Sequence, residues 1–188
     1  TLYLRDFFEF FDLQPEVVSP PKPLPFPSVI QRGFVFENVS FKYPGAERWV
    51  FQNLNFTLKA GEKLAIVGEN GAGKTTLVKL LTRLYDPTEG RILLEGRDLR
   101  DYDLGELQRH IGVIFQDYIR LMMTAQSNIA VGDIDELNNL DRIATAADRS
   151  LASALIKRFP DGLQQVLGRH FNGGVELSGG EWQKIALA

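Results

Sequence analysis

The stretch GENGAGKT, from Gly68 to Thr75, decides how this sequence is interpreted. It matches the pattern GxxxxGK[ST] at every fixed position. A compact apolar run at 63–68 leads into it, and leucines at helical spacing over 77–84 follow it. A buried strand, a glycine-rich turn and an amphipathic helix in this order predict a loop that binds phosphate groups.

The residue types in this stretch suit that chemistry. Glycines let the backbone curl tightly, so that successive N–H groups converge on an anion at the positive end of the following helix. Lys74 supplies a full positive charge near the β- and γ-phosphates, and the hydroxyl of Thr75 is placed to ligate Mg²⁺. The residues predicted to hold the nucleotide here are Gly68, Asn70, Gly71, Ala72, Gly73, Lys74, Thr75 and Thr76.

Composition excludes several other classes of protein. The 188 residues are 44% hydrophobic and 24% charged, as in an ordinary globular domain and unlike a disordered or fibrous chain. A net charge of −3 argues against a broad basic surface, so we expect no nucleic-acid partner. The absence of cysteine excludes disulfides and thiolate metal sites. The longest stretch without a formal charge, 121–132, is too short to span a membrane.

The first 33 residues differ from the rest. Aromatic side chains at helical spacing predict a short helix over 1–12, and six of the nine prolines fall in 13–33, which favours an extended, semi-rigid spacer. We expect this region to be a helix and linker that follow a segment upstream. The chain begins with Thr1 and stops at Ala188 inside a helical pattern, so we interpret it as a piece of a longer polypeptide.

From residue 34 onward the pattern predicts an α/β fold. Strands are expected near 34–43, 54–59 and 91–96, with two strands buried on both faces at 63–68 and 111–115. The stretch from about 117 to 175 is mostly helical in pattern.

Three further motifs accompany the phosphate-binding loop. They are FKYPG at 41–45, VIFQD at 113–117 and LSGGEWQ at 177–183. In this order, over residues 33–188, they resemble the A-loop, Q-loop and signature of the nucleotide-binding domain of ATP-binding cassette (ABC) proteins. Glu181 stands where that signature most often has glutamine. The linker ahead of the domain resembles that of cassettes fused behind a transmembrane domain, as in exporters and half-transporters.

The resemblance implies a fold and a set of roles. It implies a P-loop NTPase core with an antiparallel β layer and a helical subdomain at about 117–175, in a domain over 34–188. ATP and Mg²⁺ are the implied ligands. Tyr43 would stack on adenine, and Gln116 would contact Mg²⁺ and the attacking water, so that Lys74 and Gln116 are the implied catalytic residues. The residues implied to contact ATP held by a second cassette are Ser178, Gly179, Gly180 and Glu181.

The resemblance also implies partners and a location. Two cassettes, identical or different, would bind two ATP molecules head to tail on the cytoplasmic face of a cell membrane, each attached to its own transmembrane domain. In the family, the Walker B strand with its catalytic glutamate follows the signature. The sequence stops before it, so no general base is assigned and the fragment alone is expected to be inactive.

Alternatives remain at this point. Tyr43 alone is also compatible with a core aromatic, Gln116 with the end of a strand, and Ser178 with a plain helix N-cap. A soluble ABC ATPase of DNA repair or translation has the same loop and signature, and so does a cassette that binds ATP without hydrolysing it and acts as a regulator.

Overall fold

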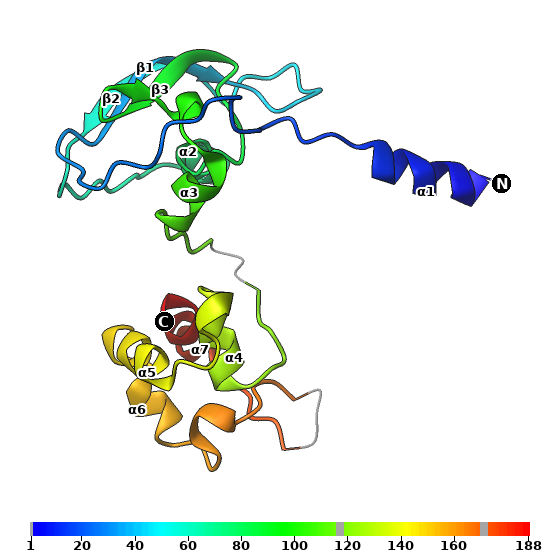
Figure 1. The fold of residues 1–188 in the computed structure, drawn as a ribbon, viewed down its shortest axis with the longest axis vertical. Helices are drawn as coiled ribbons and strands as arrows, with labels where there is room; N and C mark the ends of the chain where they lie inside the picture. Colours follow the sequence, from blue (N-terminus) through cyan, green and yellow to red (C-terminus); the bar gives the residue numbers. More distant parts are fainter. Residues whose placement is uncertain (1, 116–118, 170–172) are drawn as a thin grey trace. The chain divides into compact units, whose positions relative to one another are not determined.

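The computed structural model describes residues 2–115, 119–169 and 173–188. They form two units, Thr1–Gly112 and Val113–Ala188, which are described separately here (Figure 1). Within the described ranges, no helix has both the length and the apolar character needed to cross a bilayer.

The first unit is built on an antiparallel sheet with the strand order β2-β1-β3-β4. Its strands are β1 (Phe34–Phe41), β2 (Phe51–Leu58), β3 (Glu89–Leu94) and β4 (Arg97–Asp98). Alternating side chains of β1 pair across the sheet, for example Phe36 with Phe56 of β2 and with Ile92 of β3. Because successive side chains of a strand point to opposite faces, this register puts Phe36 and Ile92 into one buried cluster.

Helices cover that cluster. The helices of the first unit are α1 (Leu2–Asp12), α2 (Lys74–Leu81), the 3₁₀ turn η1 (Leu99–Asp101) and α3 (Leu104–Arg109). Leu77 and Leu80 of α2 and Leu107 of α3 are buried in the same cluster. The helix α2 that follows the glycine-rich loop is therefore fixed to the sheet by its apolar side.

Two predicted strands are wrong in this structure. Residues 63–68 and 111–115 have no strand conformation, and Val67 is 93% exposed. A strand buried on both faces needs hydrogen-bonded neighbours and covering layers. Among the described residues, no strand pairs with either segment. Both segments therefore have the apolar sequence of a buried strand, but the described structure provides no neighbouring strand for either of them to pair with.

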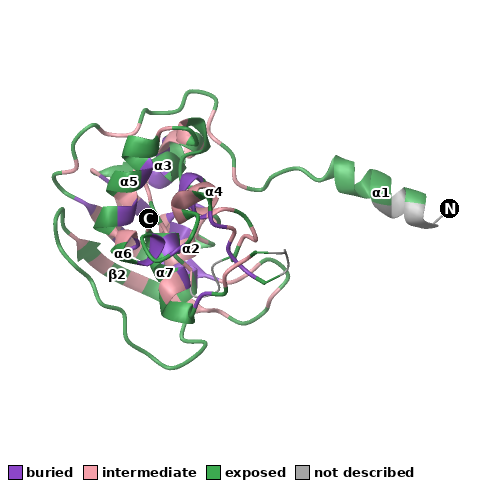
Figure 2. Ribbon diagram, turned by 90° about the horizontal axis from the view of Figure 1, so that it is seen from below, coloured by how far each residue is buried: buried purple, intermediate pink, exposed green. Residues whose placement is uncertain are grey.

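The proline-rich segment is more tightly held than a spacer. The described side chains of α1 are exposed (Figure 2), but the chain after it follows the first unit closely. We call residues 17–33 the strap. Leu24 donates to the Asp101 carbonyl at 2.7 Å and accepts from the Asp103 amide at 2.9 Å, and the ring of Phe26 stacks on His110 at 4.3 Å. Prolines keep the strap extended, while hydrogen bonds fasten it to η1 and α3.

The second unit is helical. It contains α4 (Ala125–Ala130), η2 (Ile134–Glu136), α5 (Leu140–Arg149), α6 (Ser153–Ile156), η3 (Gly162–Gln164) and α7 (Gly179–Leu187). The helices α4, α5, α6 and α7 contribute apolar side chains to one core, in which Ala152, Leu167 and Trp182 are almost fully buried. The indole nitrogen of Trp182 is buried without a hydrogen-bond partner in the described part of the chain.

Candidate functional site

The loop that precedes α2 has the backbone shape expected of a phosphate-binding loop. Gly71 and Gly73 have φ angles of 83° and 88°, in the left-handed region that favours glycine. Gly73 is also the N-cap of α2, and a Cβ atom there would lie 2.7 Å from the Val50 side chain. Only glycine therefore allows the loop to turn into the helix while passing this close to Val50.

The first turn of α2 leaves amide donors for a ligand. The helical hydrogen bonds begin with the Leu77 amide, which donates to the Gly73 carbonyl at 3.0 Å. The preceding amides of Lys74, Thr75 and Thr76 lie before any intrahelical acceptor, as at every helix start. These amides form the N-terminal end of α2, which carries a partial positive charge. A helix N-terminus of this kind is suited to binding phosphate.

Lys74 lies folded over the loop. Its ammonium donates to the carbonyl oxygens of Gly68 and Glu69, both at 2.7 Å. The amine is thus held at the mouth of the loop by two neutral acceptors. A phosphate would offer a charged acceptor in their place, and charge-assisted hydrogen bonds are the stronger kind.

The predicted magnesium ligands were tested against the described residues. No cluster of His, Asp or Glu side chains suited to a resident metal is found in the part of the chain that the structure describes. Thr75 is exposed at the first turn of α2. Mg²⁺ keeps most of its water and commonly takes one or two protein ligands together with phosphate oxygens. The residues present therefore fit an ion that arrives with the nucleotide. Gln116 lies outside the described residues.

Tyr43 is tied to the phosphate-binding helix. Its hydroxyl lies 2.9 Å from Oγ1 of the buried Thr76, and its ring makes edge contacts with Phe41 at 5.0 Å and Tyr85 at 5.3 Å. The Lys79 ammonium lies 5.4 Å from the Tyr43 ring centroid. Tyr43 is thus placed beside α2, the helix that follows the loop.

A cavity of about 420 Å³ opens beside this ring. Val17, at the start of the strap, and the preceding Glu16 form one wall of it, and the turn after β1 forms another. Its lining includes Glu16, Val17, Tyr43, Tyr85 and Asp86. The position of the strap therefore shapes the space next to Tyr43.

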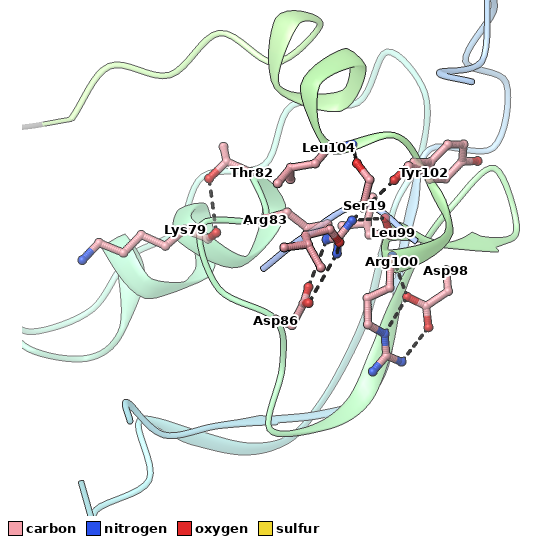
Figure 3. A network of polar contacts seen from close by, with 11 residues as sticks. Ser19, Lys79, Thr82, Arg83, Asp86, Asp98, Leu99, Arg100, Tyr102 and Leu104 are labelled. Carbon is pink, nitrogen blue, oxygen red and sulfur yellow. Dashed lines mark hydrogen bonds and ion pairs between the residues drawn. The ribbon is translucent and has the colours of Figure 1, made fainter. Parts of the chain in front are cut away.

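Arg83 fixes that position. The side chain follows α2, is 3% exposed, and donates to Asp86 at 3.1 Å (Figure 3). Another nitrogen of the guanidinium donates to the carbonyl of Val18 in the strap at 3.0 Å. The guanidinium also donates to the carbonyls of Leu99 at 3.3 Å and Tyr102 at 3.5 Å. One buried guanidinium thus joins the end of the phosphate-binding helix, η1 and the strap.

The signature residues lie in the second unit, at the start of α7. Ser178 is the N-cap of this helix, and it forms a capping box with Glu181. The Glu181 carboxylate accepts the Ser178 amide and the Ser178 hydroxyl, both at 2.9 Å. Gly179 and Gly180 are exposed, and a Cβ atom on either would meet nothing within 4 Å. The two glycines therefore leave room for a side-chain-sized group beside the first turn of α7.

Glu181 carries its charge at neutral pH. The Ser178 amide, then the Ser178 hydroxyl and then Arg158 hold the pKa of this carboxyl below its usual range. Arg158 reaches Glu181 from the residues after α6 as an ion pair. The capping box was predictable from the spacing of Ser and Glu, whereas the partnership with Arg158, 23 residues earlier, was missed.

The structure therefore brings some predicted residues together and not others. Tyr43, Thr76 and the loop at 68–75 form one site in the first unit. Ser178 to Glu181 form another in the second unit. Sequence reasoning also missed Arg83; its signal is a charged residue set between apolar neighbours in LTRLYDP, with Asp86 three residues later.

Comparison with known proteins gives a family match for most of the chain. The family model described as "ABC transporter" matches residues 51–188. The chain is 38% identical over 188 residues to the subtilin transport ATP-binding protein SpaT of Bacillus subtilis, covering 100% of the chain and 30% of that protein. It is 36% identical to the mitochondrial iron-sulfur clusters transporter ATM1 of Saccharomyces cerevisiae, covering 98% of the chain and 26% of that protein.

A solved structure agrees with these matches. A bacterial Atm1-family ABC exporter with ATP bound superposes with a TM-score of 0.84 at 34% identity, covering 98% of this chain and 31% of that chain. The chain thus spans less than a third of the relatives it matches here. The predicted α/β class with a P-loop NTPase core is confirmed by the family match and this structural similarity.

Proposed function

This chain belongs to the ABC transporter family, and on that premise we propose that it is the ATP-binding and ATP-hydrolysing cassette of an exporter. The observation that carries the proposal is the loop at 68–75, with its left-handed glycines and the first-turn amides of α2, which precede any intrahelical acceptor. ATP, bound with Mg²⁺, supplies the phosphates, and its hydrolysis drives transport by a membrane domain joined to the cassette.

The residues of the loop would act by holding charge. The amides of Lys74, Thr75 and Thr76 converge on the phosphates, and the Lys74 ammonium exchanges its two carbonyl acceptors for phosphate oxygens. Thr75 would ligate Mg²⁺, together with Gln116. The ion would neutralise charge that develops on the transferring phosphoryl group. Positioning and electrostatic stabilisation then supply most of the catalysis, as in other phosphoryl transfers.

Tyr43 would hold the base. Its ring is steadied by Phe41 and Tyr85, and its hydroxyl is anchored to Thr76, so the ring is pre-oriented beside the loop. A flat aromatic ring offers adenine a stacking surface. The hydrogen bond to Thr76 also links the base-binding residue to the helix that binds phosphate.

The signature would act on a second cassette, either another copy or a related chain. Ser178 and the open glycines of α7 present a helix N-terminus, which favours the γ-phosphate of ATP held by the partner's loop. Two ATP molecules would then join two cassettes head to tail at the cytoplasmic face of the membrane. Closure around ATP would move the attached membrane domains.

The loop is tested by Lys74→Ala in the full-length protein. We expect loss of tight MgATP binding or of turnover, because the substitution removes the ammonium at the loop. Lys59→Ala is the matched control, since it removes the same charge from an exposed site at the end of β2. ATP affinity and ATPase rate both equal to the control in Lys74→Ala would refute the proposal.

The head-to-tail arrangement needs a separate test. A photoreactive group at Ser178 should crosslink to nucleotide that is bound by the loop of the other chain. Differently tagged chains, one carrying Lys74→Ala, identify which loop held the crosslinked nucleotide. Crosslinking to nucleotide held by the same chain's loop would contradict the arrangement.

A further inference from the structure

The signature helix carries a negative charge at the end where a phosphate is expected. The Glu181 carboxylate lies in the first turn of α7, and its Oε2 is already occupied by the Ser178 amide and hydroxyl. The pKa of this carboxyl is lowered, so the group is ionised at neutral pH. A carboxylate at this place favours the helix dipole but repels an approaching phosphate.

Arg158 supplies the opposite charge. Its guanidinium pairs with Oε1 of Glu181, the oxygen that the capping box leaves over. The Arg158 side chain is 65% exposed and that of Glu181 is 29% exposed, so the pair borders solvent where a partner could dock. Arg158 therefore both offsets the carboxylate charge and holds the carboxylate in the orientation that binds Ser178.

We propose that Arg158 is a positioning residue of the signature: it makes a glutamate at 181 compatible with binding the partner cassette's γ-phosphate. The inference rests on the proposed function of the signature and adds to it a residue from the turn after α6. Without Arg158, the Glu181 charge faces the phosphate unopposed, and only the capping box orients the carboxylate.

The alternative is that the pair only joins the end of α6 to α7. A purely structural link would be needed whether residue 181 is charged or neutral. The two explanations therefore differ in how Arg158→Ala behaves in a Glu181→Gln background. Glutamine keeps an acceptor oxygen for Ser178 but brings no charge, so in that background Arg158 has nothing to offset.

The experiment uses the full-length protein with four variants: Arg158→Ala, Glu181→Gln, the double variant, and the control Lys157→Ala. Lys157 is the adjacent cation, and its side chain makes no ion pair within the described residues. Steady-state ATPase gives kcat and KM, and binding of a fluorescent ATP analogue reports the affinity of each chain's own loop.

We expect Arg158→Ala to lower kcat about five- to tenfold, while analogue affinity stays within about twofold of wild type. In the Glu181→Gln background, adding Arg158→Ala should change kcat less than twofold relative to Glu181→Gln alone. The Arg158→Ala defect should also shrink as salt rises from about 0.05 to 0.5 M, because screening weakens exposed charge repulsion. Lys157→Ala should match wild type.

Three results would overturn the inference: an equal loss of kcat in both backgrounds, no loss in Arg158→Ala, or complete loss of turnover in Glu181→Gln alone. Gly179→Asp separates this failure from failure of the proposed function. If Gly179→Asp blocks turnover but Arg158→Ala does not, only the role of Arg158 is wrong. If Gly179→Asp leaves turnover unchanged, the signature itself does not act on ATP.

Discussion

Replacing Arg83 with methionine should release the strap from the first unit. The substitution keeps an apolar stem of similar length but removes every donor of the guanidinium. Asp86 and the carbonyls of Val18, Leu99 and Tyr102 lose a partner (Figure 3). Arg83 is only 3% exposed, so water cannot easily replace the guanidinium, and the methionine leaves those acceptors without a charged donor.

The size of the effect follows from these contacts. Removing one partner of a buried ion pair costs about 3–5 kcal/mol. Asp86 is 29% exposed and regains part of its hydration, so we expect about 3 kcal/mol for the whole unit. The strap itself loses one hydrogen bond from a charged donor to Val18, worth about 1.5–3 kcal/mol. Local opening of the strap should therefore become about 10 to 150 times more frequent.

Hydrogen exchange measured by mass spectrometry tests both numbers on one sample. Strap peptides that contain the Leu24 amide report local opening, and peptides of β1 report unfolding of the unit. Arg91→Met is the control, because the Arg91–Glu37 pair is 57% and 39% exposed and should contribute less than about 1 kcal/mol. Strap exchange within twofold of wild type in Arg83→Met would refute this account of the strap.

Other predictions concern the sheet, the base-binding residue and pH. Gly90→Ala should destabilise the first unit by about 3 kcal/mol in urea unfolding, because its Cβ would lie 2.3 Å from a backbone oxygen of β1. Gly45→Ala is the control: its Cβ would meet open space, so it should cost only about 1 kcal/mol. Equal costs for the two variants would contradict this. Tyr43→Ala should weaken ATP binding by about 1–3 kcal/mol in titration calorimetry, and Tyr43→Phe, which loses only the hydroxyl, by less than about threefold; unchanged affinity in both would place the adenine elsewhere. Three strap amides, that of Gly33 foremost, donate to the Glu95 carboxylate and hold its pKa below 4.5. The stabilisation from these hydrogen bonds is complete above that value and is lost as pH falls through the lowered pKa. Hydrogen exchange at residues 31–33 should therefore rise on acidification in wild type but not in Glu95→Gln.

Features that depend on near neighbours in the chain were predictable. The loop at 68–75 and the start of α2 follow from glycines and a Lys-Thr pair in sequence, and the structure has the expected left-handed glycines. The capping box lies within the four residues from Ser178 to Glu181, and the apolar pattern of Phe34, Phe36, Val39 and Phe41 lies within the eight residues of β1. In each case the hydrogen bonds or the periodicity are local, so the sequence contains all the interacting groups side by side.

Features that depend on partners far away in the sequence were not predictable. The apolar run at 63–68 was predicted as a buried strand, but no described strand pairs with it, and strand conformation requires hydrogen bonds from a neighbour. The strap has the composition of a spacer, yet Arg83, 65 residues from Val18, fastens it. Arg158 meets Glu181 across 23 residues. Composition and periodicity describe each segment alone, whereas the energy of a buried charge or a paired edge depends on which segment folds against it; only the tertiary structure decides that.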